Sequence, residues 1–97
     1  MTLSDLIIAV RDEKLNKDQL EAYRSQMSDL FAQMQIEMAD LEKEEALFLN
    51  EHEGTAIARK ISWKATKSGQ RLIVLKRYCL ATKELLRSLQ SRLYSIY

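Results

Sequence analysis

Apolar side chains recur along this chain at helical spacing, mostly in steps of three and four residues. The first such stripe consists of Leu3, Leu6, Ile7 and Val10. It predicts a short helix over about residues 3–13. Asn16, with Gln19 three positions later, has the form of a capping box, in which each residue bonds the backbone of the other. A second helix is therefore predicted to start near Lys17.

The second helix meets no helix-breaking residue until Gly54, and it is predicted over residues 17–52. Its apolar stripe consists of Leu20, Met27, Phe31, Met34, Met38, Leu41 and Phe48. Other apolar residues widen this stripe, namely Leu30, Ile36, Leu47 and Leu49. A stripe wider than a two-position seam indicates a helix that contacts more than one neighbour. Gly54 then suits a left-handed backbone after the helix, and Thr55 can cap the next one.

The last segment has the most regular pattern, a heptad register held for about five repeats. Its positions are Ile61, Ala65, Ser68, Leu72, Leu75, Cys79, Thr82, Leu86, Leu89, Leu93 and Ile96. This register predicts one continuous helix over about residues 55–96. Gly69 lies inside it and costs about 1 kcal/mol relative to Ala, so it marks either a kink or a close helix contact.

The predicted fold is all-α and forms a single domain over residues 1–97. The turn at Gly54 folds the third helix back on the second, which gives a long antiparallel hairpin of coiled-coil type. Trp63 is then expected near Glu42. The short N-terminal helix packs at the open end of the hairpin, whose arm would be about 50 Å long at about 1.5 Å per residue. A hairpin this thin leaves apolar surface exposed, which predicts a homo-oligomer.

Composition agrees with long helices. The 97 residues include no Pro and only two Gly, whereas a sheet would need frequent turn residues. The single Cys excludes an internal disulfide. No apolar run approaches the ~18 residues of a membrane span, and the N-terminal apolar run has no basic leader. We therefore expect a cytoplasmic protein that does not bind membranes.

Charge is distributed unevenly along the chain. Residues 1–53 have a net charge of −8 and residues 54–97 a net charge of +9, although the whole chain carries only +1. An acidic helix beside a basic one is electrostatically complementary along its length, which favours the predicted pairing. Single exposed ion pairs contribute only about 0–1 kcal/mol each. Their combined effect is on register more than on stability.

No catalytic signature is present. His52 is the only His and Cys79 the only Cys, and a zinc site needs several such ligands at set spacings. Cys79 occupies a heptad core position and is interpreted as a small buried hydrophobe. We expect no enzyme activity, cofactor, metal or small-molecule substrate.

Basic residues gather in the last segment and are candidate contacts for a partner or for nucleic acid. The candidates are Arg59, Lys60, Trp63, Lys64, Lys67, Arg71 and Arg77. A basic helix is the expected footprint of phosphate contacts. Trp63 has two alternatives: it can stack on a base, or it can pack within the fold, for example against Phe48.

Acidic residues gather before the turn, where six of the fourteen residues from Asp40 to Glu53 are Asp or Glu. The candidate acidic interaction patch consists of Glu42, Glu44, Glu45 and Glu51. One interpretation is a solvated helix face. The other is a surface that binds a basic partner or imitates the charge of nucleic acid.

The sequence WKATKSGQRLIVLKRY, with the leucine-rich basic helix that follows, resembles short helical accessory proteins encoded by bacteriophages. The resemblance covers about residues 61–93. It implies a small protein that acts by binding in a bacterial host cell, in recombination or replication or by blocking a host defence. The leading hypothesis is a non-enzymatic protein-interaction module. The alternatives are a nucleic-acid-binding protein that uses the basic C-terminal helix, and an inhibitor of a nuclease or defence system that uses the acidic helix.

Overall fold

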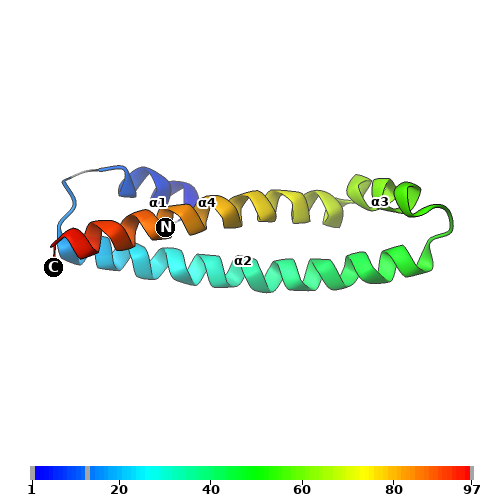
Figure 1. The fold of residues 1–97 in the computed structure, drawn as a ribbon, viewed down its shortest axis with the longest axis horizontal. Coiled ribbons are helices and arrows are strands. Elements are labelled where there is room, and N and C mark those ends of the chain that lie inside the picture. The colour runs from blue at the N-terminus through cyan, green and yellow to red at the C-terminus, as the bar shows by residue number, and fades with distance from the viewer. Residues whose placement is uncertain (1, 13, 97) are drawn as a thin grey trace.

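The structure, a computed structural model, describes residues 2–12 and 14–96. Over these residues the chain forms four helices: α1 (Leu3–Val10), α2 (Lys17–Glu51), α3 (Ala56–Ala65) and α4 (Lys67–Ile96). The two long helices, α2 and α4, run antiparallel, with α3 at the tip of the hairpin and α1 at its open end (Figure 1). The molecule measures 56 × 21 × 17 Å. The predicted all-α hairpin with a short N-terminal helix is confirmed.

Side-chain caps define the starts of the first two helices. Thr2 and Asp5 form a capping box at α1, in which the Thr2 hydroxyl accepts the Asp5 N–H at 3.2 Å. The same arrangement joins Asn16 and Gln19 at α2, where the side-chain oxygen Oδ1 of Asn16 accepts the Gln19 N–H at 2.8 Å. The start of α2 is therefore confirmed.

The first helix ends earlier than predicted, at Val10 rather than near residue 13, which lies outside the described residues. A carboxylate oxygen of Asp12 accepts the N–H of Lys14 at 2.9 Å. Such a local turn competes with continuation of the helix, because it uses an aspartate side chain in place of a helical carbonyl.

The turn at the tip follows the predicted chemistry. The second helix ends at Glu51, and Gly54 has a φ of 118°, in the left-handed region where a side chain would be strained. Thr55 caps α3 by accepting the N–H of Ala58 at 3.1 Å. The guanidinium of Arg59 donates to the carbonyl of Leu49 at 2.7 Å. This bond satisfies one of the carbonyls that the end of α2 leaves without a helical partner.

The prediction of one continuous helix over residues 55–96 is wrong, because Thr66 separates α3 from α4. Its backbone is extended, with ψ of 160°. Its hydroxyl donates to the Trp63 carbonyl at 2.6 Å and accepts the Gly69 N–H at 2.9 Å. The Thr66 side chain therefore ends α3 and caps α4. Its two local hydrogen bonds take the place of backbone hydrogen bonds that a continuous helix would form here.

This break changes which residues face the second helix. Ile61 and Ala65, predicted as core positions, are exposed, and Trp63 is buried instead. Beyond the break the predicted register holds for the buried side chains Leu72, Leu75, Thr82, Leu89 and Leu93.

The core has two parts. One lies at the open end around Leu6, Val10, Leu20, Met27, Leu89 and Leu93. The other lies nearer the tip around Leu41, Trp63, Leu72 and Leu75.

Candidate functional site

A groove at the hairpin tip brings together residues from both charged segments. It has a volume of about 350 Å³ and is lined by Glu44, Leu47, Phe48, Glu51, Trp63, Thr66 and Ser68. Trp63 is only 5% exposed, and its ring centroid lies 5.6 Å from that of Phe48. Phe48 in turn stacks on His52 at 3.7 Å. The base of the groove is thus aromatic. Glu42, the predicted neighbour of Trp63, is exposed, and Phe48 takes that place.

The predicted acidic patch is divided by the geometry of the second helix. Glu44 and Glu51 are one heptad apart and both line the tip groove. Glu42 and Glu45 do not line it, and they are one heptad from Gln35 and Met38, which line a different groove. Two of the four carboxylates therefore form one surface, on either side of Leu47 along the helix.

The predicted basic contacts also divide into two groups. Arg59 and Arg71 are used within the fold, Arg59 at the end of α2 and Arg71 in an ion pair with Glu37. Four exposed basic residues have side-chain cations that make no hydrogen bond or ion pair with any described residue, namely Lys60, Lys64, Lys67 and Arg77. For Trp63, the structure shows packing against Phe48 rather than presentation of the ring to solvent.

The Arg71–Glu37 pair links the two long helices. The Nε of Arg71 lies 2.9 Å from Oε1 of Glu37, and its Nη2 lies 3.0 Å from Oε2. This two-point bond lowers the pKa of the Glu37 carboxyl and raises that of the Arg71 guanidinium. Both side chains are about half exposed, so the pair orients the helices more than it stabilises them.

A second groove lies halfway along the hairpin, with a volume of about 360 Å³. Its lining consists of Phe31, Gln35, Met38, Lys76, Cys79, Leu80 and Lys83. The Cys79 sulfur lies 3.3 Å from the sulfur of Met38. Burial raises the pKa of the Cys79 thiol, which keeps it protonated and weakly nucleophilic at neutral pH. His52 lies at the tip, so it provides no base for this thiol.

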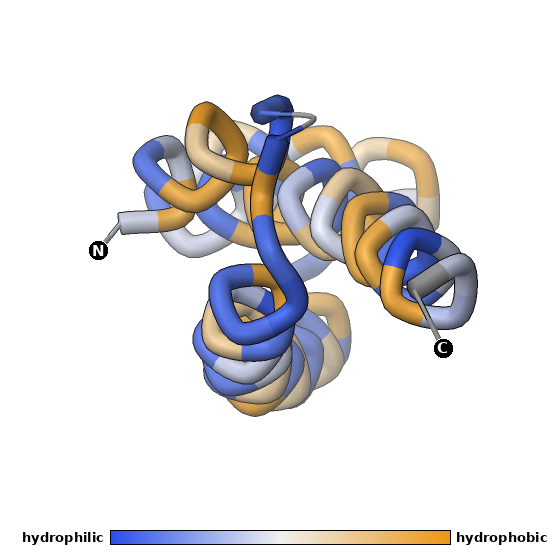
Figure 2. The backbone as a smooth tube through the Cα atoms, turned by 90° about the vertical axis from the view of Figure 1, so that its left-hand side faces the viewer, coloured by the Kyte–Doolittle hydropathy of each residue, from blue (hydrophilic) through white to orange (hydrophobic). Residues whose placement is uncertain are grey.

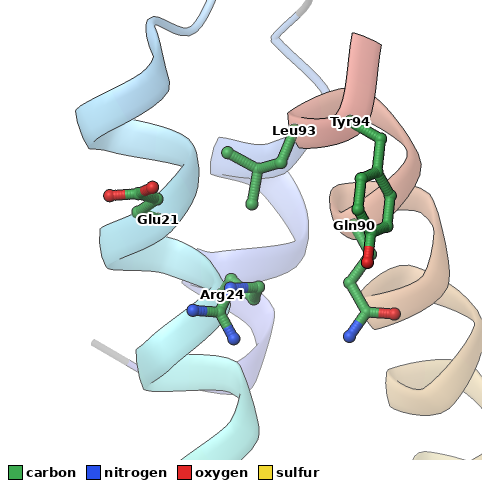
Figure 3. A pocket seen from close by; sticks show the side chains of 5 residues that line it. All are labelled: Glu21, Arg24, Gln90, Leu93 and Tyr94. Carbon is green, nitrogen blue, oxygen red and sulfur yellow. The ribbon is translucent and has the colours of Figure 1, made fainter. Parts of the chain in front are cut away.

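A third groove of about 260 Å³ lies near the open end and is lined by Glu21, Arg24, Gln90, Leu93 and Tyr94. Figure 3 shows Leu93 reaching from α4 toward α2, with Glu21 and Arg24 along one wall and Gln90 and Tyr94 along the other. The mixture of ionic, amide and aromatic groups on an open surface suits contact with another macromolecule better than enclosure of a small substrate.

Several exposed apolar side chains were not predicted as contacts. They are Ile57, Leu80 and Tyr94, to which Ile61 is added because the break turns it outward. The sequence could have indicated these contacts, because Ile57, Leu80 and Tyr94 are large apolar or aromatic residues that lie outside the heptad seam. Large apolar residues at exposed positions indicate an interaction surface when they gather in patches.

No group of three or more His, Cys, Asp or Glu side chains that could hold a metal lies among residues 2–12 and 14–96. In the same part of the chain, no helix is both long and apolar enough to cross a membrane.

The fold and its grooves define the protein as an all-α helical hairpin with open, partly apolar surfaces. A scan against protein-family models found no match, and searches of curated proteins and of solved structures found none either.

Proposed function

We propose that the protein is a non-enzymatic interaction module whose protein partner binds at the hairpin tip. The observation that carries this proposal is the exposure of three branched aliphatic side chains there. Leu47, Ile57 and Ile61 are 61–73% exposed, at the end of the molecule that is otherwise rich in charge. Exposed apolar groups with a polar rim are typical of protein-binding surfaces.

The tip groove indicates the chemistry of the partner. Phe48 and Trp63 form an aromatic base, and the carboxylates of Glu44 and Glu51 lie at its sides. An apolar side chain flanked by Lys or Arg is complementary to such a groove. The apolar part supplies most of the affinity, and the charges contribute to the association rate and to specificity.

The distribution of basic residues supports a protein partner over nucleic acid. Arg71 pairs with Glu37 on one flank of the hairpin, whereas Lys76 and Lys83 line the groove on another. Basic side chains therefore surround α4 instead of forming one stripe that could follow a phosphate backbone.

The test is capture of partners from a bacterial lysate, since the resemblance of residues 61–93 points to phage accessory proteins and thus to a bacterial host. Three baits are compared, each with and without nuclease treatment: the native chain, the double variant Leu47→Ser/Ile61→Ser, and the control Ile8→Ser, which changes an exposed residue of α1. We expect the native chain to capture a protein whether or not the lysate is treated with nuclease. The double variant should fail to capture this protein, and the control should still capture it.

Loss of the captured protein on nuclease treatment would instead indicate tethering through nucleic acid. Equal capture by the native chain and the double variant would exclude the tip as the binding surface.

A further inference from the structure

One side of the hairpin is open along most of its length. The middle groove and the open-end groove lie on this same side, because their lining residues are related by heptad spacing. On α2 these residues are Arg24, Phe31 and Met38, and on α4 they are Lys76, Lys83 and Gln90. We call the side that carries the two grooves the open face.

Helix α1 covers the opposite side. Its core residues pack with Tyr23, Leu30 and Leu85 of the long helices. Arg92, one heptad after Leu85, donates to the carbonyl of Val10 at 2.7 Å. Figure 2 shows α1 and α4 on different sides above α2. The open face is therefore the side of the hairpin that the N-terminal helix leaves uncovered.

Two heptad stripes border the open face, and they are complementary in size. The stripe on α4 consists of Ile73, Leu80, Arg87 and Tyr94. The stripe on α2 consists of Ser25, Ala32, Ala39 and Ala46, all exposed. Each stripe lies one residue after the seam, so both point outward on the same side. Large side chains on one helix and small ones on the other allow close interdigitation when α4 of one molecule meets α2 of another.

We propose that two copies of the chain pair through their open faces, with both tips at the same end, to form a four-helix bundle. In this arrangement α4 of each copy packs on α2 of the other. The second copy is thus the partner that this surface fits, and Leu80 of each copy lies against the Ala39 stripe of the other.

Charge selects this geometry over the reverse one. The second helix has a net charge of −6 and the fourth a net charge of +6. If the tips pointed in opposite directions, face-to-face pairing about a two-fold axis would place α2 on α2 and α4 on α4, with like charges opposed. With the tips together, each acidic helix lies beside a basic one, and Lys76 comes near the level of Gln35 and Glu42.

The first experiment is sedimentation equilibrium of the native chain up to about 100 µM. We expect a mass of twice the chain's 11.3 kDa. The variant Leu80→Glu should weaken the dimer about tenfold or more, because it places a carboxylate in the packed interface. Its matched control is Ile36→Glu, an equally exposed residue on the outer side of α2 (65% against 66%), which should leave the dimer unchanged. A monomeric native chain, or equal effects of the two variants, would overturn the proposal.

The variant Ala39→Phe separates close packing from general hydrophobic attraction. This change adds apolar area at the small stripe. It should weaken the proposed dimer, since the large ring occupies the space that Leu80 of the second copy fills. Stronger association of Ala39→Phe than of the native chain would contradict the proposed packing.

The orientation is tested by spin-label distances from Glu53→Cys in a Cys79→Ala background. With both tips at one end, the distance between labels should be well under the 56 Å length of one chain. A distance near or above that length would show that the tips point in opposite directions and would overturn the geometry.

These results do not depend on the proposed tip function. The double variant Leu47→Ser/Ile61→Ser should remain dimeric, and Leu80→Glu should retain the aromatic tip groove. If both proposals hold, the dimer presents two tip sites in the same direction, so a partner with two binding sites gains avidity.

Discussion

Gly69, in the first turn of α4, lies against the backbone at the end of α3. A Cβ added at this residue would lie 2.0 Å from the carbonyl oxygen of Trp63 and 2.8 Å from its carbon. Both are backbone atoms, so no flexible side chain can move aside. The glycine inside the heptad pattern thus lies beside the break at Thr66 and permits a close backbone approach across it, so both alternatives that the sequence left open apply.

We predict that Gly69→Ala destabilises the fold by about 1–3 kcal/mol, the usual cost of overpacking. Helix propensity alone would give the opposite sign, a gain of about 1 kcal/mol. Urea unfolding followed by circular dichroism measures the change. Ser88→Ala, at an exposed position of α4, is the control and should have little effect. Stabilisation by Gly69→Ala would contradict the close contact.

Thr82 is a polar residue buried in the core, with its side chain fully inaccessible. Its hydroxyl has no hydrogen-bond partner among the described residues. Burying a hydroxyl without a partner opposes folding by about 1–3 kcal/mol.

We therefore predict that Thr82→Val, which keeps the shape and removes the hydroxyl, raises the free energy of unfolding by about 1 kcal/mol. Thr82→Ser is the comparison, since it keeps the hydroxyl, removes a buried methyl group and should lower stability. Thermal and urea unfolding of both variants would check this order, and a less stable valine variant would show that the hydroxyl has a stabilising role.

At the scale of elements, helix starts follow from short polar motifs, and helix interiors follow from apolar spacing. The capping box at Asn16 and the turn at Gly54 and Thr55 were predictable because each depends on a few neighbouring residues. The break at Thr66 was not predicted. Its flanking residues fit a heptad register, and Thr is acceptable in a helix, so the local pattern does not distinguish a cap from an interior position.

The variant Thr66→Ala tests this break. Loss of the shared hydroxyl bonds should cost about 1 kcal/mol, within the range for helix caps, and Thr66→Ser should retain most of the stability. Unfolding in urea gives the energies, and circular dichroism gives the helix content. A gain in both for Thr66→Ala would mean that one continuous helix over residues 55–96 is the preferred state.

At the scale of the whole molecule, α1 closes only the open end of the hairpin. Leu6 is fully buried there, and Arg92 fixes the end of α1 through the carbonyls of Val10 and Asp12. The rest of the hairpin is two helices thick, which leaves its grooves accessible (Figure 1).

We predict that Leu6→Ala destabilises the open end by about 2–5 kcal/mol, the range for removing a buried leucine side chain. Amide hydrogen exchange should accelerate in α1 and in the adjoining ends of α2 and α4, with a smaller effect near Trp63. Ile8→Ala changes an exposed residue of the same helix and should alter stability by less than about 0.5 kcal/mol. Equal effects of the two variants would contradict the docked position of α1.

The sequence by itself determined the all-α class, the hairpin, the caps and the second half of the heptad seam. These features depend on periodicity and on residues close together in the chain. Tertiary structure decided the break at Thr66, the burial of Trp63 against Phe48 and the division of the acidic patch between two sides of the hairpin. Each of these depends on how α2 packs against the returning helices α3 and α4, and thus on contacts between residues far apart in the chain.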